Sequence, residues 1–229
     1  MYKKMTDNIL TGVFGFIIFL CFILIIKDVI NYRKADREYT RLKEYITEDL
    51  EDEQIGNMKD EVVAAKLQTD AVSDYEKLYE INNDLVCILS IPALGLKYPV
   101  VQSKDNVKYL DLTFEGNRNP AGCLFMDYEN TPKLTDPNTY IYGHNMKDGS
   151  MFGSLKKMTG DDFDKSKAQA YLMTENGMCS YSLERAEIVN IDEYKPPQDE
   201  KDMLTLYTCW GNDKSKRLLV TFEKNREAV

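Results

Sequence analysis

The sequence predicts a mainly β domain, a closed or nearly closed barrel of eight or nine short strands, preceded by N-terminal helices and one transmembrane helix. Three observations predict this architecture. Residues 9–26 carry no charge, residues 27–83 are charge-rich with almost no Gly or Pro, and from residue 84 short apolar runs alternate with turn-forming clusters. With 229 residues and 43% apolar content, the chain can bury one sizeable core.

The apolar run at residues 9–26 is dominated by Ile, Phe and Leu. Roughly 18 residues of helix span about 27 Å, close to the hydrocarbon thickness of a bilayer. Lys27 and Asp28 follow the run directly, where a signal peptide would have small residues, so we expect an uncleaved anchor after a short segment at residues 1–8. Basic residues lie on both sides of the run, so charge does not predict its orientation.

Residues 27–83 are predicted to form a helical stalk and a second helix that packs on the barrel. A coiled coil is the alternative, although Thr69 and Glu76 interrupt the apolar seam. Apolar residues at three- and four-residue spacing define the predicted buried face, which has a weak point at Gly56: Leu42, Tyr45, Ile46, Leu50, Met58, Val62, Ala65, Val72 and Tyr79.

The barrel domain is assigned to residues 84–229, with short helices at 106–110 and 151–158. Closing a sheet of many short strands removes its exposed edges, which favours a barrel. Runs of β-branched and aliphatic residues, separated by Gly, Pro and Asn, predict strands at 85–91, 97–102, 122–127, 139–142, 168–173, 178–183, 186–191, 204–208 and 217–222.

Composition argues against two classes of function. The chain has 29 basic and 38 acidic residues, a net charge of −9 and no stripe of basic and aromatic residues, so the phosphates of a nucleic acid would be repelled. Five widely spaced cysteines and one histidine, without a Cys-x-x-Cys pair, do not predict a zinc site, and we expect no metal or other cofactor. An odd number of cysteines leaves at least one thiol unpaired, and pairing of the others stays open.

The first candidate catalytic group is a cysteine at the end of a predicted strand. Cys209 ends the strand at 204–208, a polar connection at 210–216 follows, and Arg217 begins the next strand. In a hairpin, Cys209 and Arg217 would face each other with Cβ atoms about 4.5–5.5 Å apart. A cation beside a thiol favours the reactive thiolate. Taken alone, the pattern also fits a small buried cysteine and a solvated arginine.

The only histidine is the second candidate. His144 follows the predicted strand 139–142 and Gly143, and glycine permits a tight exit from a strand. We therefore expect the imidazole at a rim of the barrel and not sealed in its core. A structural, hydrogen-bonded histidine is the alternative. The order of His144 before Cys209 does not decide the chemistry, because catalytic groups meet in space and not in sequence order.

Longer stretches around these candidates form a specific set of motifs. They are Tyr140-Ile141-Tyr142-Gly143-His144-Asn145-Met146, then Gly149-Ser150-Met151-Phe152, then Thr205-Leu206-Tyr207-Thr208-Cys209, and Arg217. This set resembles the sortases. Tyr98-Pro99-Val100-Val101-Gln102, Asp105-Asn106, Tyr109-Leu110 and Gly122-Cys123-Leu124-Phe125-Met126-Asp127 are similar to class B in particular. The resemblance covers roughly residues 85–223. It implies a sortase-type eight-stranded β-barrel in a membrane-tethered cysteine transpeptidase on the surface of a Gram-positive bacterium.

The resemblance also implies roles and partners. Cys209 would attack a peptide carbonyl and form a thioester, His144 would protonate the leaving amine, and Arg217 would hold the substrate carbonyl. The implied substrate is a Leu-Pro-x-Thr-Gly-like signal in exported proteins, cut between Thr and Gly. The implied acceptor is a cell-wall peptide amine such as that of lipid II. The family further implies a single-pass protein with its N-terminus inside and its catalytic domain outside.

One segment departs from the family pattern. Class B sortases carry a longer, helix-containing insertion before the cysteine strand, whereas this chain has only residues 192–203, with Pro196 and Pro197. That loop shapes the substrate groove in the family, so the accepted pentapeptide stays open. Trp210 and the loop 128–137 are further candidates to line a groove. Two alternatives remain, a pilus-polymerising sortase and a catalytically silent, membrane-tethered binding module.

Overall fold

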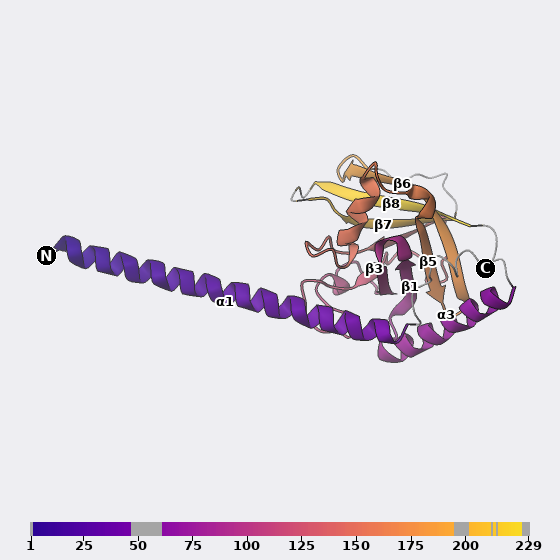
Figure 1. The fold of residues 1–229 in the computed structure, drawn as a ribbon, viewed down its shortest axis with the longest axis horizontal. Helices are drawn as coiled ribbons and strands as arrows, with labels where there is room; N and C mark the ends of the chain where they lie inside the picture. The colour runs from indigo at the N-terminus through magenta and orange to yellow at the C-terminus, as the bar shows by residue number, and fades with distance from the viewer. Residues whose placement is uncertain (1, 47–60, 195–201, 212, 214, 226–229) are drawn as a thin grey trace.

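The computed structural model describes residues 2–46, 61–194, 202–211, 213 and 215–225. Eight strands close into one barrel in the order β1-β2-β3-β4-β7-β8-β6-β5 (Figure 1), which confirms the predicted fold class. The strands are β1 Leu85–Ile91, β2 Leu96–Val101, β3 Leu124–Met126, β4 Asn138–Tyr142, β5 Gln169–Thr174, β6 Gly177–Asn190, β7 Met203–Cys209 and β8 Lys216–Lys224.

The structure corrects one strand prediction and refines the predicted helices. Strands expected separately at 178–183 and 186–191 form the single strand β6, whose pairing with β8 shifts register between Leu183 and Arg185. Such an irregularity changes the pairing without ending the strand. The two expected short helices are 3-10 helices, η2 Lys108–Leu110 and η3 Phe152–Thr159, and two more are present, η1 Pro92–Leu94 and η4 Lys165–Lys167.

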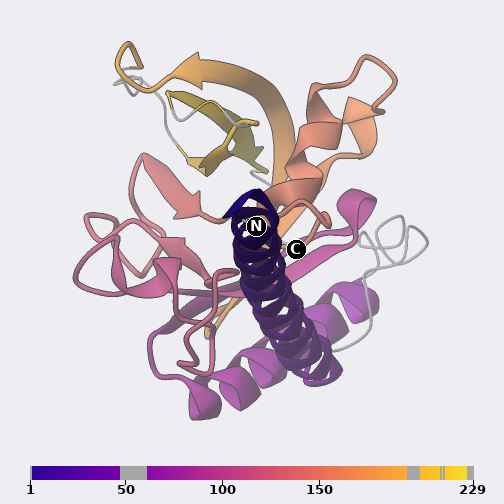
Figure 2. The same cartoon turned by 90° about the vertical axis from the view of Figure 1, so that its left-hand side faces the viewer.

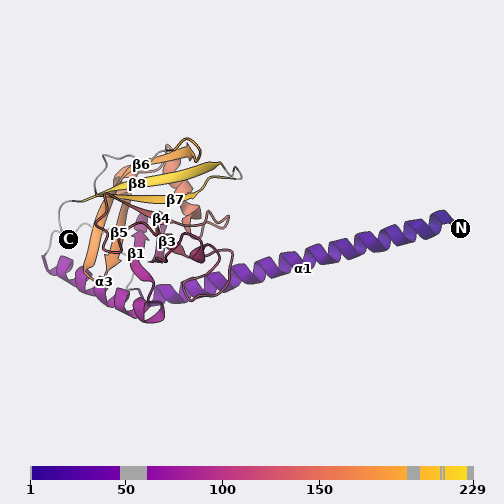
Figure 3. The same ribbon diagram turned by 180° about the vertical axis from the view of Figure 1, so that it is seen from behind.

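Two strand pairings bring distant parts of the chain to one rim of the barrel. β4 and β7 are parallel neighbours, with Tyr142 opposite Tyr207, so both strands end at the same rim. β7 and β8 form an antiparallel hairpin, so β8 begins at that rim. The arrow of β8 points away from the N-terminal end of α1 (Figures 1 and 3), so this rim is the end of the barrel nearer that end of α1.

The helix α1 (Tyr2–Glu44) projects from the barrel as one continuous element (Figure 1). From Gly12 onward it contains a segment that is long and apolar enough to cross a membrane, and the structure buries none of that segment. No helix break occurs at residue 26, where the anchor was predicted to end, so the division between anchor and stalk stays a prediction. The end of α1 and the turn after it pack on the barrel through four buried apolar side chains: Ala35, Tyr39, Leu42 and Ile46.

The helix α3 (Glu61–Ile81) lies along the same side of the barrel as the end of α1 (Figure 2). Among residues 66–81, whose side chains the structure describes, the buried ones are Ala71, Asp74, Tyr75 and Leu78. The predicted face was therefore partly wrong. Val72 is half-buried, and Tyr45 and Tyr79 are each 41% exposed.

The buried face of α3 was predicted wrongly because three- and four-residue spacing fits two neighbouring stripes of a helix. Packing on the barrel buries the stripe that contains Asp74. The same packing means that the barrel, and not a second helix, occupies this face of α3. The predicted positions Leu50, Gly56 and Met58 lie outside the described residues, as do the side chains of Val62 and Ala65.

Candidate active site

The hairpin β7–β8 places the candidate cysteine opposite the candidate arginine. Cys209 and Arg217 are direct Cα partners in the antiparallel register, as the length of the connection predicted. The pair is closed by a hydrogen bond from the Trp210 amide to the Lys216 carbonyl at 3.1 Å. The Cys209 thiol is exposed. The structure therefore presents a reachable sulfur on the rim beside a permanent positive charge.

Arg217 contacts the backbone of its own strand, β8, and a tyrosine ring of β7. Its Nη1 donates to the Lys216 carbonyl at 2.9 Å, and its guanidinium lies 6.0 Å from the ring centroid of Tyr207. Burial raises the pKa of Tyr207, and the charge of Arg217 opposes that rise without cancelling it. Tyr207 is thus a neutral hydroxyl beside the guanidinium of Arg217.

The segment after β4 is bonded to the end of β7. The Gly143 amide donates to the Tyr207 carbonyl at 3.2 Å, the Thr208 hydroxyl donates to the Gly143 carbonyl at 2.7 Å, and the Asn145 side-chain amide donates to the Cys209 carbonyl at 2.9 Å. A Cβ at Gly143 would overlap side chains of the core, so only glycine fits this close approach. These bonds fix His144 next to the strand that ends in Cys209.

The imidazole of His144 is oriented by a backbone carbonyl from a distant loop. Its Nε2 lies 2.7 Å from the carbonyl oxygen of Leu110. A carbonyl can only accept, so Nε2 carries the hydrogen and donates it. This hydrogen bond fixes the plane of the ring. In the neutral ring it places the hydrogen on Nε2, so Nδ1 is the nitrogen without a hydrogen.

A cavity of about 640 Å³ unites the three sequence-predicted residues, because Cys209, His144 and Arg217 all line it. Of the predicted groove elements, the loop 128–137 contributes to the lining, whereas Trp210 is partly buried against the core. The loop 192–203 reaches the cavity through Tyr194, and its residues 195–201 lie outside the described residues. The remaining lining residues are Asn106, Leu110, Phe125, Asp127, Glu129, Asn130, Tyr140, Tyr142, Gly143, Ile191, Tyr207 and Thr208.

Sequence reasoning missed a polar and aromatic cluster in the cavity wall. The Tyr142 hydroxyl donates to Oδ2 of Asp127 at 2.6 Å, and the Asn106 side-chain amide donates to the same oxygen at 3.1 Å. Burial, reinforced by Asp127, raises the pKa of Tyr142 well above its ordinary value. The ring of Tyr142 also stacks on Phe125 at 5.3 Å and meets Tyr207 edge-on at 5.1 Å. Alternation along 138–142, with tyrosines at 140 and 142, was the available signal.

Neither a disulfide nor a cluster of metal-type ligands is present among the residues that the structure describes. All five cysteines are free thiols, and Cys87 and Cys123 are buried. Among the residues that the structure describes, no three His, Cys, Asp or Glu side chains gather as metal ligands would. The cavity at the rim is therefore the candidate active site.

Comparison with known proteins decides the family. A family model described as the sortase domain matches residues 89–225, which is more than half of the chain. The chain belongs to the sortase family. Among curated proteins, it is similar to sortase B of Listeria monocytogenes, with 43% identity over 115 residues, or 50% of this chain and 45% of that protein. The chain thus matches less than half the length of this curated relative.

Solved structures of class B sortases share the fold. Sortase B of Bacillus anthracis, in complex with AAEK2, is 27% identical with a TM-score of 0.59, and the match covers 73% of this sortase and 98% of that chain. A substrate complex of Staphylococcus aureus sortase B is 22% identical with a TM-score of 0.66, and the match covers 86% and 98%. Together with the curated relative, these neighbours place this sortase with class B.

Proposed function

We propose that this sortase is a cysteine transpeptidase and that Cys209, His144 and Arg217 are its catalytic residues. The observation that carries the proposal is the single cavity that all three side chains line, with Cys209 and Arg217 as direct cross-strand partners. Acyl transfer needs a nucleophile, a proton carrier and a group that stabilises an oxyanion. These three side chains supply them in that order.

The reaction begins when the thiolate of Cys209 attacks a backbone carbonyl carbon and forms a tetrahedral intermediate. The carbon–nitrogen bond then breaks, leaving a thioester on Cys209 and an amine that takes a proton from His144. An incoming amine attacks the thioester, gives a proton back to His144, and releases the thiolate with a new amide bond. With Nε2 bonded to Leu110, Nδ1 is the ring nitrogen that exchanges these protons.

Arg217 stabilises charge in both halves of the reaction. A guanidinium carries a permanent positive charge, so it stabilises the negative charge that develops on the substrate oxygen in each tetrahedral intermediate. The planar head presents several donors in a fixed geometry to the substrate carbonyl. A lysine at this position would keep the charge and lose that geometry.

The proposed substrate is a Leu-Pro-x-Thr-Gly-like signal of exported proteins, cut between Thr and Gly. The proposed acceptor is a cell-wall peptide amine such as that of lipid II. The family resemblance supports both, and the aromatic wall formed by Phe125, Tyr142 and Tyr207 offers an apolar surface for the first residues of such a peptide. In this proposal residues 9–26 anchor the sortase in the cell membrane, which the apolar segment of α1 supports. The N-terminus lies inside and the barrel outside, an orientation that rests on the family resemblance alone.

Mass spectrometry of the detergent-solubilised full chain tests the proposal. With a suitable pentapeptide, we expect an acyl adduct on Cys209 and, when an amine-bearing stem peptide is added, a new amide product. The adduct should be absent in Cys209→Ala and present in the matched control Cys179→Ala, whose thiol lies on β6 away from the cavity.

The outcomes separate the competing functions. An adduct that persists in Cys209→Ala overturns the assignment of the nucleophile. Transfer to the lysine side chain of a subunit peptide, in preference to a stem-peptide amine, identifies a pilus-polymerising enzyme. No adduct with any peptide of a complete pentapeptide library favours the membrane-tethered binding module.

A further inference from the structure

The end of α1 buries a carboxyl group that is hydrogen-bonded to the loop 113–117. Glu38 is 6% exposed, although it carries a carboxylate. Its oxygens accept hydrogen bonds from the Thr113 hydroxyl at 2.8 Å, the Glu115 amide at 3.0 Å and the Asn117 side-chain amide at 3.2 Å. Buried carboxylates persist where several donors hold them. Glu38 therefore fixes the loop 113–117 to the helix.

The neighbouring Tyr39 bonds to the segment that packs against the carbonyl orienting the imidazole. Its hydroxyl donates to the carbonyl of Gly122 at 2.6 Å. Gly122 has a positive φ of 59°, and a Cβ there would lie 2.6 Å from the carbonyl oxygen of Tyr109 and 2.7 Å from that of Leu110. The backbone at 122 thus packs directly on the backbone at 109–110, so a shift of Gly122 moves the Leu110 carbonyl, the partner of His144 Nε2.

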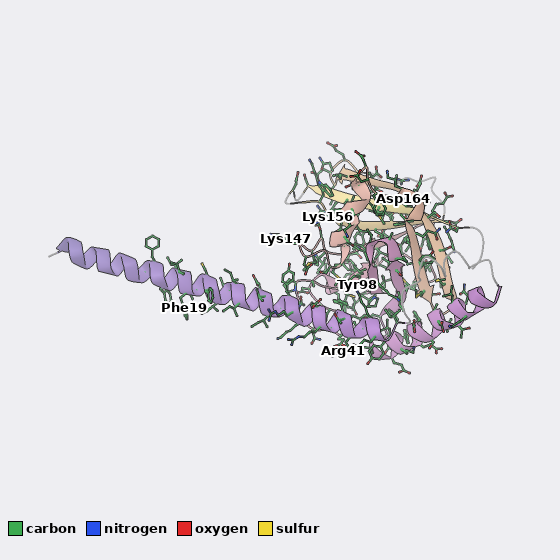
Figure 4. The ribbon with its side chains drawn as sticks, viewed as in Figure 1. Phe19, Arg41, Tyr98, Lys147, Lys156 and Asp164 are labelled. Carbon is green, nitrogen blue, oxygen red and sulfur yellow. The ribbon has the colours of Figure 1, made fainter. Side chains whose placement is uncertain are left out.

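The ring of Tyr39 reaches the backbone of the histidine by a second route. It meets the ring of Tyr98 edge-on, with centroids 5.3 Å apart, and Figure 4 shows Tyr98 beside the end of α1. The Tyr98 hydroxyl accepts a hydrogen bond from the Met151 amide at 3.2 Å. The next amide, that of Phe152, donates to the carbonyl of His144 at 3.0 Å. One buried side chain of α1 therefore supports both the ring and the backbone of the histidine.

We propose that Tyr39 is a positioning residue for His144, through its hydroxyl bond to Gly122 and its ring contact with Tyr98. The inference deepens the proposed function and rests on it for the catalytic role of His144. Tyr39 does not line the cavity, so its effect on catalysis passes through the two loops. It follows that the helix carrying the apolar segment also sets the geometry of the active site.

The chain offers a matched control on the other helix. Tyr75 of α3 is also buried, and its hydroxyl also donates to a barrel carbonyl, that of Leu85 at 3.1 Å. Tyr39→Phe and Tyr75→Phe each remove one buried hydroxyl and leave the ring. In the detergent-solubilised full chain, we expect similar losses of stability but a lower kcat only in Tyr39→Phe. Loss of one hydrogen bond that positions the histidine should lower kcat by about three- to tenfold and leave KM unchanged.

The single histidine gives a readout that does not depend on turnover. Selective isotope labelling of histidine yields the imidazole signals of His144 alone, since the chain has one histidine. We expect the Nε2–H signal to shift or broaden in Tyr39→Phe and to match wild type in Tyr75→Phe. The pH profile of kcat should change only in the first variant.

The outcomes distinguish this inference from the proposed function. Unchanged imidazole signals, or an equal change in both variants, overturn the positioning role of Tyr39, even if the wild type forms the Cys209 adduct. A wild type without any adduct refutes the proposed function, and the imidazole signals still decide whether Tyr39 positions His144.

Discussion

Helices α1 and α3 contact the barrel with the same chemistry and to different effect. Each buries a tyrosine whose hydroxyl donates to a backbone carbonyl, Tyr39 to Gly122 and Tyr75 to Leu85. Gly122 belongs to a loop that packs on the partner of the histidine, whereas Leu85 begins β1, a fully buried strand. The same kind of buried hydrogen bond, from a tyrosine hydroxyl to a backbone carbonyl, can therefore stabilise an active site or only the fold. The position of the accepting carbonyl determines which of the two it stabilises.

The largest expected effect is on stability, through α3. Leu78 is fully buried, so Leu78→Ala should lower the free energy of unfolding by about 2–5 kcal/mol. Turnover measured per folded molecule should stay at the wild-type value, because α3 packs on β1, β5 and β6, and no residue of these strands lines the cavity. Chemical denaturation of the full chain measures the first quantity, and the exposed Glu80→Ala provides the control. A fall in turnover of the folded variant would break the distinction between the helices.

A change in α1 should affect stability and turnover together. Glu38→Gln places an amide among three donors and loses at least one of their hydrogen bonds, which costs about 1–3 kcal/mol. Because the loop at 113–117 loosens, kcat should fall as well. Denaturation and steady-state kinetics check both quantities, with the exposed Glu76→Gln of α3 as the matched control. Wild-type kcat in a destabilised Glu38→Gln would show that α1 supports only the fold.

Two buried thiols report on the two helices separately. Burial raises the pKa of Cys123 to about 12 and also raises that of Cys87, so both stay protonated at pH 8 and react slowly with iodoacetamide. Burial is the main cause of the raised pKa of Tyr39, and the nearby Cys123 adds to it. Burial likewise raises the pKa of Tyr75, and Cys87 is among the groups that add to it. Cys123 therefore lies near α1, and Cys87 lies near α3.

Loosening one helix should therefore expose one thiol. We expect Tyr39→Leu to speed labelling of Cys123, and Tyr75→Leu to speed labelling of Cys87, each about tenfold if local opening becomes easier by about 1.4 kcal/mol. Peptide mapping by mass spectrometry measures both rates in one sample. Faster labelling of both thiols in either variant would mean that the two helices open as one unit.

The smallest expected effect concerns Asp84, which lies between the end of α3 and the start of β1. Burial raises the pKa of Asp84, but hydrogen bonds from Lys108 and Tyr109 outweigh it and hold that pKa below its ordinary value. A lowered pKa means that the contribution is complete above about pH 4 and is lost as pH falls through the folded-state value. Asp84→Asn should therefore remove part of the loss of stability below pH 4, which acid titration of unfolding measures. An identical acid profile in the variant would assign no stability to this contact.

Much of the site followed from local sequence rules. The connection at 210–216 predicted that Cys209 and Arg217 would face each other, since hairpin register follows from loop length. Gly143 predicted the exit of His144 at a rim. The sequence did not reveal that β4 and β7 are parallel neighbours, because a pairing between strands so far apart leaves no local signal. The resemblance to sortases implied only that His144 and Cys209 act in one site.

The parts that sequence reasoning missed depend on backbone atoms and on packing. The Leu110 carbonyl lies 34 positions from His144, and every residue has a carbonyl, so no side-chain pattern could single it out. The choice between the two stripes of α3 depended on the shape of the barrel, and it placed the acidic Asp74 on the buried face. The union of two predicted strands into β6 depended on a register shift that periodicity does not encode.

If residues 9–26 form the proposed anchor, the continuity of α1 sets the distance between the barrel and the lipid. The first barrel contact along the helix is at Asn31, whose carbonyl accepts a hydrogen bond from the Asn119 side chain at 2.7 Å, only a few residues after the proposed anchor ends at residue 26. At a rise of 1.5 Å per residue, those residues span about 8 Å. With the rim that carries Cys209 toward that end of α1 (Figure 1), the proposed anchor would hold the cavity close to the lipid headgroups, where the proposed substrates leave the bilayer.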